Sequence, residues 1–142
     1  DPYEATRIDS FLDASLNFAV ESQKYLFAFG DQTKLVQAHL DMSAAYETYM
    51  LGMERALSNS AFIASENISL ADIACACEIA LFALERHEQK KLAKVQCEPI
   101  FNTVATECVR AHQHLEMLYA EPAFLPDVTP YFNEMTMKKA FG

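Results

Sequence analysis

The side chains best able to bind a metal ion are the histidines and cysteines, and the 142 residues contain four of each. His87 and Glu88 could begin the helical zinc motif HExxH, but Lys91 stands where that motif has its second histidine. His112 and His114 are two residues apart, so on a helix they point in different directions. The sequence therefore predicts no metal site.

The spacing of the cysteines does not predict a disulfide framework. Cys75 and Cys77 lie about 200° apart around a helix axis, so their sulfur atoms cannot readily meet. This cysteine usage favours a reducing compartment, and we expect a cytoplasmic location. Both residues lie in the most apolar stretch of the chain, where burial would raise the thiol pKa and make a cysteine unreactive.

The best-defined polar pair in the chain is Ser69 and Asp72. Ser69 fits the N-cap of a helix, where its hydroxyl can accept a hydrogen bond from the unpaired N–H of Asp72. Asp72 can bond back to the N–H of Ser69, which makes a capping box, and Ile68 and Ile73 are spaced as a hydrophobic staple around it. A nearly all-apolar run follows and indicates a central, buried helix. We therefore interpret the pair as a folding signal rather than as catalytic residues.

Two long helices precede this one. Apolar residues recur at helical spacing from Pro2 to Phe29, Gly30 ends that run, and a second periodic run extends from Gln32 to Leu57. We expect the two helices to form an antiparallel hairpin. The first carries two apolar stripes, one of Ile8, Leu12, Leu16, Ala19 and Leu26, and one of Phe11, Phe18, Tyr25 and Phe29. One stripe should pack on the core, and the other on the same domain, a partner subunit, another domain or a ligand.

The rest of the chain completes a helical bundle. The capped helix is predicted to run to about Glu88, a fourth helix to open at Glu98-Pro99 and run to Leu118, and prolines to break the tail after Glu121. The sequence thus predicts one all-α domain over residues 1–142. It is a helical bundle of four long helices and a shorter terminal element.

Composition argues against several classes of function. Hydrophobic residues make up 51% of the chain, which is too many for a disordered protein. The net charge of -9 would repel phosphate groups, so we expect neither nucleic-acid binding nor attraction to an anionic membrane. No apolar run is long enough to cross a bilayer.

The helix order and two motifs give the chain a family resemblance. Ala61-Phe62-Ile63-Ala64 and then Ile68-Ser69-Leu70-Ala71-Asp72-Ile73 match the entry to the core helix of one superfamily. Shorter matches are Arg7-Ile8-Asp9-Ser10-Phe11-Leu12, Arg110 and Glu121-Pro122-Ala123-Phe124. From about Pro2 to Phe124 the chain resembles the C-terminal all-α domain of the glutathione S-transferase superfamily.

The resemblance implies a second domain and a reaction. A thioredoxin-like domain would lie N-terminal to this one, with residues 1–3 in the linker, and would hold glutathione and the residue that activates its thiol. The reaction would be attack of the glutathione thiolate on an electrophile. The present domain would contain no catalytic residue and would be inactive alone. Homodimerisation is also expected from the family.

The resemblance also implies where ligands would bind. The first helix would supply one wall of the pocket for the hydrophobic co-substrate, from Phe11, Ser15, Phe18 and Tyr25. A polar residue of the same helix can approach the glutathione amino group in some classes. Asp9 and Asp13, and again Ser15, are the candidates here.

A second hypothesis needs no enzyme activity. Domains of this fold are similar to the interaction modules appended to translation elongation factors and aminoacyl-tRNA synthetases, where they bind one another. The uncommitted apolar stripe of the first helix fits this hypothesis too. Upstream sequence without a thioredoxin-like βαβ pattern would favour it.

Overall fold

The computed structural model describes residues 1–103 and 107–132, and this part of the chain is helical without a strand. The α-helices are α1 (Pro2–Ala28), α2 (Gln32–Leu57), α3 (Leu70–Phe82), α4 (Gln89–Lys94), α5 (Val109–Ala120) and α6 (Thr129–Phe132). Two 3-10 helices, η1 (Ala83–Glu88) and η2 (Ile100–Asn102), join them. The all-α prediction is confirmed for the described residues.

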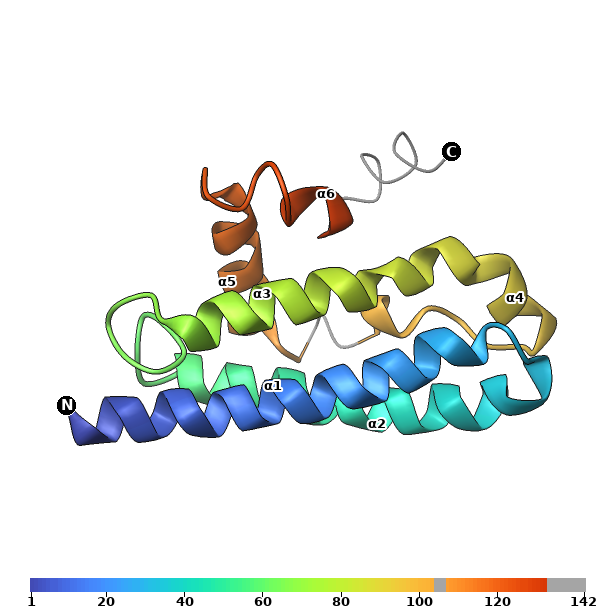
Figure 1. The fold of residues 1–142 in the computed structure, drawn as a ribbon, viewed down its shortest axis with the longest axis horizontal. Coiled ribbons are helices and arrows are strands. Elements are labelled where there is room, and N and C mark those ends of the chain that lie inside the picture. Colours follow the sequence, from blue (N-terminus) through green and yellow to red (C-terminus); the bar gives the residue numbers. More distant parts are fainter. Residues whose placement is uncertain (104–106, 133–142) are drawn as a thin grey trace.

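Helices α1 and α2 form the expected antiparallel hairpin and lie with α3 along the long axis of the molecule (Figure 1). Asp1 caps α1 by accepting a hydrogen bond from the N–H of Tyr3, and Asp31 caps α2 in the same way through Thr33. Each cap satisfies a backbone donor that a helix start leaves unpaired. Only Phe29, Gly30 and Asp31 separate the two helices, so the turn is tight.

Helix α3 begins with the capping box that the sequence predicts. The Ser69 hydroxyl accepts from the N–H of Ala71 at 3.2 Å, and the Asp72 carboxylate accepts from the N–H of Ser69 at 2.9 Å. Ile68 and Ile73, the two residues of the expected staple, are each more than 40% exposed. The helix axis continues from Phe82 into η1, which ends at Glu88.

The prediction that this helix is buried all round is wrong for one of its faces. Its inner side, including Cys75 and Ile79, is fully buried. Leu70, Ile73 and Leu81 are spaced on the opposite side and are 62%, 41% and 46% exposed. Helices α1, α5 and α6 contact α3, and residues 127–131 lie beside Cys77 and Leu81, but Leu70, Ile73 and Leu81 remain in large part exposed.

The predicted fourth helix starts too early. Gln96 has a left-handed backbone (φ 58°) just after α4, and only the short η2 follows before α5 begins at Val109. The Glu85 carboxylate accepts a hydrogen bond from the N–H of Phe101, which holds this stretch against η1 instead of within a helix. Val104 and Ala105, two residues assigned to that helix, lie outside the described residues.

The core lies where α1, α2, α3 and η2 meet. It is dominated by aromatic side chains that contact one another across these elements, with ring centroids 4.9 Å apart for Tyr46 and Phe82 and 5.6 Å apart for Phe18 and Phe82. Three methionines of α2 fill the remaining gaps. The α1–α2 hairpin is therefore firmly packed, and its two helices hold the side chains of a surface groove in place.

Candidate functional site

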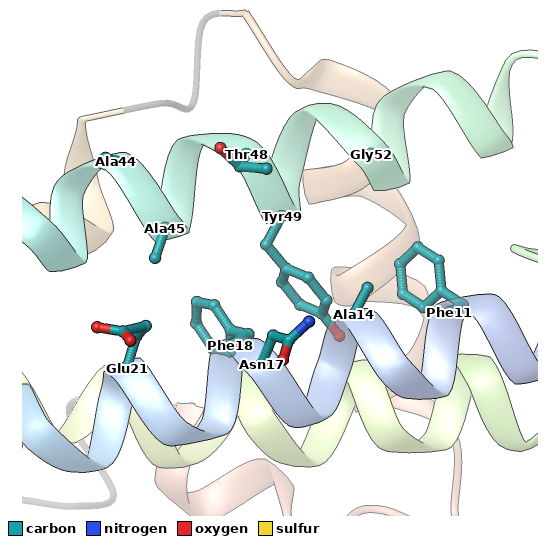
Figure 2. Close-up of a pocket in the computed structure, with 10 residues that line it drawn as sticks. All are labelled: Phe11, Ala14, Asn17, Phe18, Glu21, Ala44, Ala45, Thr48, Tyr49 and Gly52. Carbon is teal, nitrogen blue, oxygen red and sulfur yellow. The ribbon is translucent and has the colours of Figure 1, made fainter.

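An apolar groove of about 460 Å³ runs between α1 and α2 (Figure 2). We call it the α1–α2 groove. It is lined by Phe11, Ala14, Asn17, Phe18 and Glu21 of α1 and by Ala44, Ala45, Thr48, Tyr49 and Gly52 of α2. Most of these side chains are apolar, and Glu21 is the one acidic residue among them.

Three aromatic rings form the floor of the α1–α2 groove. The rings of Phe18 and Tyr49 stack with centroids 4.5 Å apart, and Phe11 lies 5.5 Å from Tyr49 at a tilt (Figure 2). The Tyr49 hydroxyl shares a 2.6 Å hydrogen bond with Ser15, so the polar end of this ring is satisfied beneath the floor. Burial raises the pKa of Tyr49, so its hydroxyl stays protonated and cannot serve as a base near neutral pH.

Small residues leave room above this floor. A Cβ atom added at Gly52 would meet no heavy atom within 4 Å, and Ala14, Ala44 and Ala45 present only methyl groups. A site with an aromatic floor, small walls and few polar groups suits an apolar or aromatic ligand.

The structure separates the four residues predicted to form the co-substrate pocket. Phe11 and Phe18 line the α1–α2 groove together. Ser15 is buried below it, where its hydroxyl donates to the Phe11 carbonyl as well as contacting Tyr49. Tyr25 is 1% exposed, and its hydroxyl donates to Glu85 at 2.7 Å, so its visible role is structural.

The residues predicted to approach glutathione lie elsewhere on α1. Asp9 and Asp13 are both exposed and are not among the lining residues of the α1–α2 groove. The half of the groove that α2 contributes was not anticipated. Its signal in the sequence is the run of small residues at helical spacing, Ala44, Ala45, Thr48 and Gly52, which leaves one side of α2 without bulk.

Two buried carboxylates, those of Asp72 and Glu85, link helices of the bundle through hydrogen bonds. Asp72 accepts hydrogen bonds from the N–H of Ile63 at 3.1 Å and of Ser69, and its Oδ1 lies 2.8 Å from Nε2 of His114. Burial alone would raise the pKa of Asp72, but the bonds from His114, Ile63 and Ser69 outweigh it and hold the pKa below its usual range. Asp72 therefore stays ionised and joins α3, α5 and the preceding loop.

Glu85 is the second of these carboxylates and shows the opposite shift. Burial raises its pKa, although the N–H of Phe101 and the hydroxyl of Tyr25 donate to it and oppose the change. It joins η1 to α1 and η2. Neither carboxylate lines the α1–α2 groove, so both are structural.

The thiols differ from the sequence expectation in one respect. Burial raises the pKa of Cys75 and of Cys77, as predicted, but only Cys75 is fully buried, and Cys77 is exposed on the outer side of α3. All four cysteines are unpaired. Within residues 1–103 and 107–132, no three His, Cys, Asp or Glu side chains are placed to share a metal ion.

No family model matches the chain, and neither a curated protein nor a solved structure matches it. None of the described helices is long and apolar enough to span a membrane.

Proposed function

We propose that this chain is the C-terminal helical domain of a glutathione S-transferase-like protein, in which it forms the wall that binds the hydrophobic co-substrate. A thioredoxin-like domain, joined to the chain or separate, would bind glutathione and activate its thiol. The protein would work in the cytoplasm as a homodimer. Attack of the thiolate on the electrophile would then require from this domain only shape and the exclusion of water.

One observation carries the proposal: Phe11 and Phe18, expected in the co-substrate pocket, line the same apolar groove. The capping box at Ser69 and Asp72 and the order of the helices add support. The absence of a nucleophile from the groove fits a domain that selects the co-substrate and leaves activation to its partner domain.

The test measures conjugation of glutathione to 1-chloro-2,4-dinitrobenzene, a small aromatic electrophile. The 142-residue chain is assayed alone and joined to the thioredoxin-like domain that the proposal requires upstream. We expect activity only for the joined form. An isolated chain that conjugates at a comparable rate would contradict the proposal, as would an upstream sequence that encodes no such domain.

A groove-filling substitution locates the co-substrate. Gly52→Leu adds a side chain into open space above the aromatic floor and leaves the buried contacts intact. In the joined form we expect it to raise the KM for the electrophile at least about tenfold while the KM for glutathione is unchanged. Glu47→Leu is the control, because it adds the same side chain to α2 at an exposed position outside the groove and should leave both KM values alone. Unchanged KM values in Gly52→Leu would remove the α1–α2 groove from the proposal.

The second candidate is an assembly module of the kind appended to elongation factors or aminoacyl-tRNA synthetases. It is favoured by the exposed apolar side chains Phe27 and Leu81, which a transferase wall in the α1–α2 groove leaves unexplained. Direct binding of elongation-factor or synthetase subunits by a chain that lacks conjugating activity would support this candidate over the enzyme.

A further inference from the structure

A second apolar surface lies on the other side of α1, where this helix meets α3. We call it the α1–α3 face. Leu16, Val20 and Phe27 of α1 and Leu81 of α3 are its large apolar residues, and they are between 45% and 75% exposed. Gln23 and Glu78 lie among them in a groove of about 540 Å³. The exposed side chains of Leu70 and Ile73 extend the α3 side toward the start of that helix.

The dimensions of the α1–α3 face fit a helix. Leu16 and Phe27 are eleven residues apart, which corresponds to about 16 Å or three helical turns. Two helices packed side by side, as α1 and α3 are, form a groove into which a third can lay its side chains (Figure 1). Apolar residues on both sides along these three turns match the spacing of side chains on one face of a helix.

The carboxylate of Glu78 indicates which kind of side chain a partner helix would need at this groove. One of its carboxylate oxygens is buried and has no hydrogen-bond partner in the described part of the chain. Glu78 is also the one ionisable residue among those that line this groove. A carboxylate that is taken out of water needs a donor or a cation, and an apolar partner surface would bury it further. Glu78 as a whole is only half-buried and lines the groove, so a basic side chain of a partner can meet the accessible side of its carboxylate and supply both a donor and the opposite charge.

The acidic residues near this groove also favour a positively charged partner. Asp9 and Asp13 are exposed on α1, seven and three residues before Leu16, and so share its side of the helix. The whole chain has a net charge of -9. An anionic lipid surface or an acidic peptide would be repelled here, whereas a basic amphipathic segment would be attracted.

We propose that the α1–α3 face binds an amphipathic helix of a protein partner, with one lysine or arginine of that helix's apolar face bonded to Glu78. The apolar residues of the partner helix would cover Leu16, Val20, Phe27 and Leu81. This proposal does not depend on glutathione chemistry, and it concerns the opposite side of α1 from the α1–α2 groove.

The test is selection from a displayed library of amphipathic helices whose apolar positions vary among Leu, Gln, Glu and Lys. The bait is the 142-residue chain. We expect selected helices to carry lysine at one apolar position and to lose affinity at least about tenfold against Glu78→Gln. The double variant Phe27→Ser with Leu81→Ser should abolish binding, and Gly52→Leu, in the other groove, should leave it unchanged.

Four outcomes would overturn the proposal. They are a selection that returns no binder, binders without lysine, binders that lose nothing against Glu78→Gln, and binders that the Gly52→Leu substitution displaces. Circular dichroism of each variant establishes that the helices are retained. Phe27 and Leu81 are exposed and Glu78 lacks a hydrogen-bond partner for one oxygen, so these substitutions should not unfold the chain.

Discussion

At the scale of single residues, Asp72 does more than cap a helix. A cap needs only the bond to the N–H of Ser69, yet the same carboxylate also accepts from Ile63 and lies in contact with His114. The side chain is fully buried, so each of these partners replaces a hydrogen bond that water would otherwise make. Loss of the carboxylate would leave several buried donors unpaired at once.

We therefore expect Asp72→Asn to lower the free energy of unfolding at pH 7 by about 3 kcal/mol. An asparagine can accept at one oxygen only, and its amide group would face donors instead of acceptors. Urea denaturation of both proteins measures the difference. Asp13→Asn serves as the control because Asp13 is exposed and its change should have little effect. Equal urea midpoints for the wild type and Asp72→Asn would contradict the assignment.

The same residue predicts a pH dependence. The pKa of Asp72 is lowered in the folded chain, so the unfolded chain binds its proton more readily. The stabilisation is then complete above the unfolded value of about 4 and is lost as the pH falls through the lower, folded value. The gap in unfolding free energy between wild type and Asp72→Asn should be constant from pH 5 to 7 and shrink below about pH 4. A gap that grows on acidification would refute this sign.

At the scale of elements, α6 shows how a short helix is held in place. Four residues are too few for a stable isolated helix, so its order must come from contacts. The Phe132 ring stacks on Tyr119 with centroids 4.1 Å apart, and the Thr129 hydroxyl donates to the Tyr119 carbonyl. The Arg86 guanidinium lies 4.6 Å from the Phe101 ring centroid and donates to the Phe132 carbonyl.

Arg86→Lys should therefore loosen α6 without affecting the α1–α2 hairpin. Lysine keeps the charge but lacks the flat guanidinium that stacks and donates at the same time. We expect faster hydrogen exchange at the amide of Tyr131 and a loss of about 1 kcal/mol in stability. Amides in the middle of α2 provide the internal reference. Unchanged exchange at Tyr131 would show that the ring contacts of Phe132 suffice.

At the scale of the whole molecule, the described residues combine a well-packed core with the exposed apolar side chains of the α1–α3 face. The core side of α1 includes Phe18 and Tyr25, both almost fully buried, whereas Phe27 on the same helix is 75% exposed. A contiguous apolar patch of this kind usually marks a contact surface. It includes Leu16, Ala19 and Leu26 of the aliphatic stripe of α1, so that stripe is only partly covered within the described residues.

Replacing the apolar residues of this patch should reduce the binding of a hydrophobic dye and leave the free energy of unfolding nearly unchanged. Phe27→Ser with Leu81→Ser should reduce the fluorescence of the hydrophobic dye Nile red, while the free energy of unfolding stays within about 0.5 kcal/mol of wild type. Phe18→Ala, made in the core, should instead cost about 4 kcal/mol. If the double variant is destabilised as strongly as Phe18→Ala, the face belongs to the core.

The sequence by itself determined the features that depend on neighbouring residues. The capping box spans four positions, and its bonds follow from the side chains of Ser69 and Asp72 and the local backbone. The long helices α1 and α2 follow from periodicity and from Gly30 between them. The prediction from local sequence was wrong after α4. There the N–H of Phe101 donates to Glu85, sixteen residues away, and no helix starts at Glu98-Pro99.

Only the tertiary structure decided which side chains meet across the chain. Asp72 and His114 are 42 positions apart, and Tyr25 and Glu85 are 60 apart, so no local pattern could pair them. Packing of α1 against α2 and α3 also decided which of its two apolar stripes became the core. The aromatic stripe turned inward, and the stripe that contains Leu16 was left in part outside. Periodicity shows that a face is apolar, but what covers that face depends on residues elsewhere in the fold.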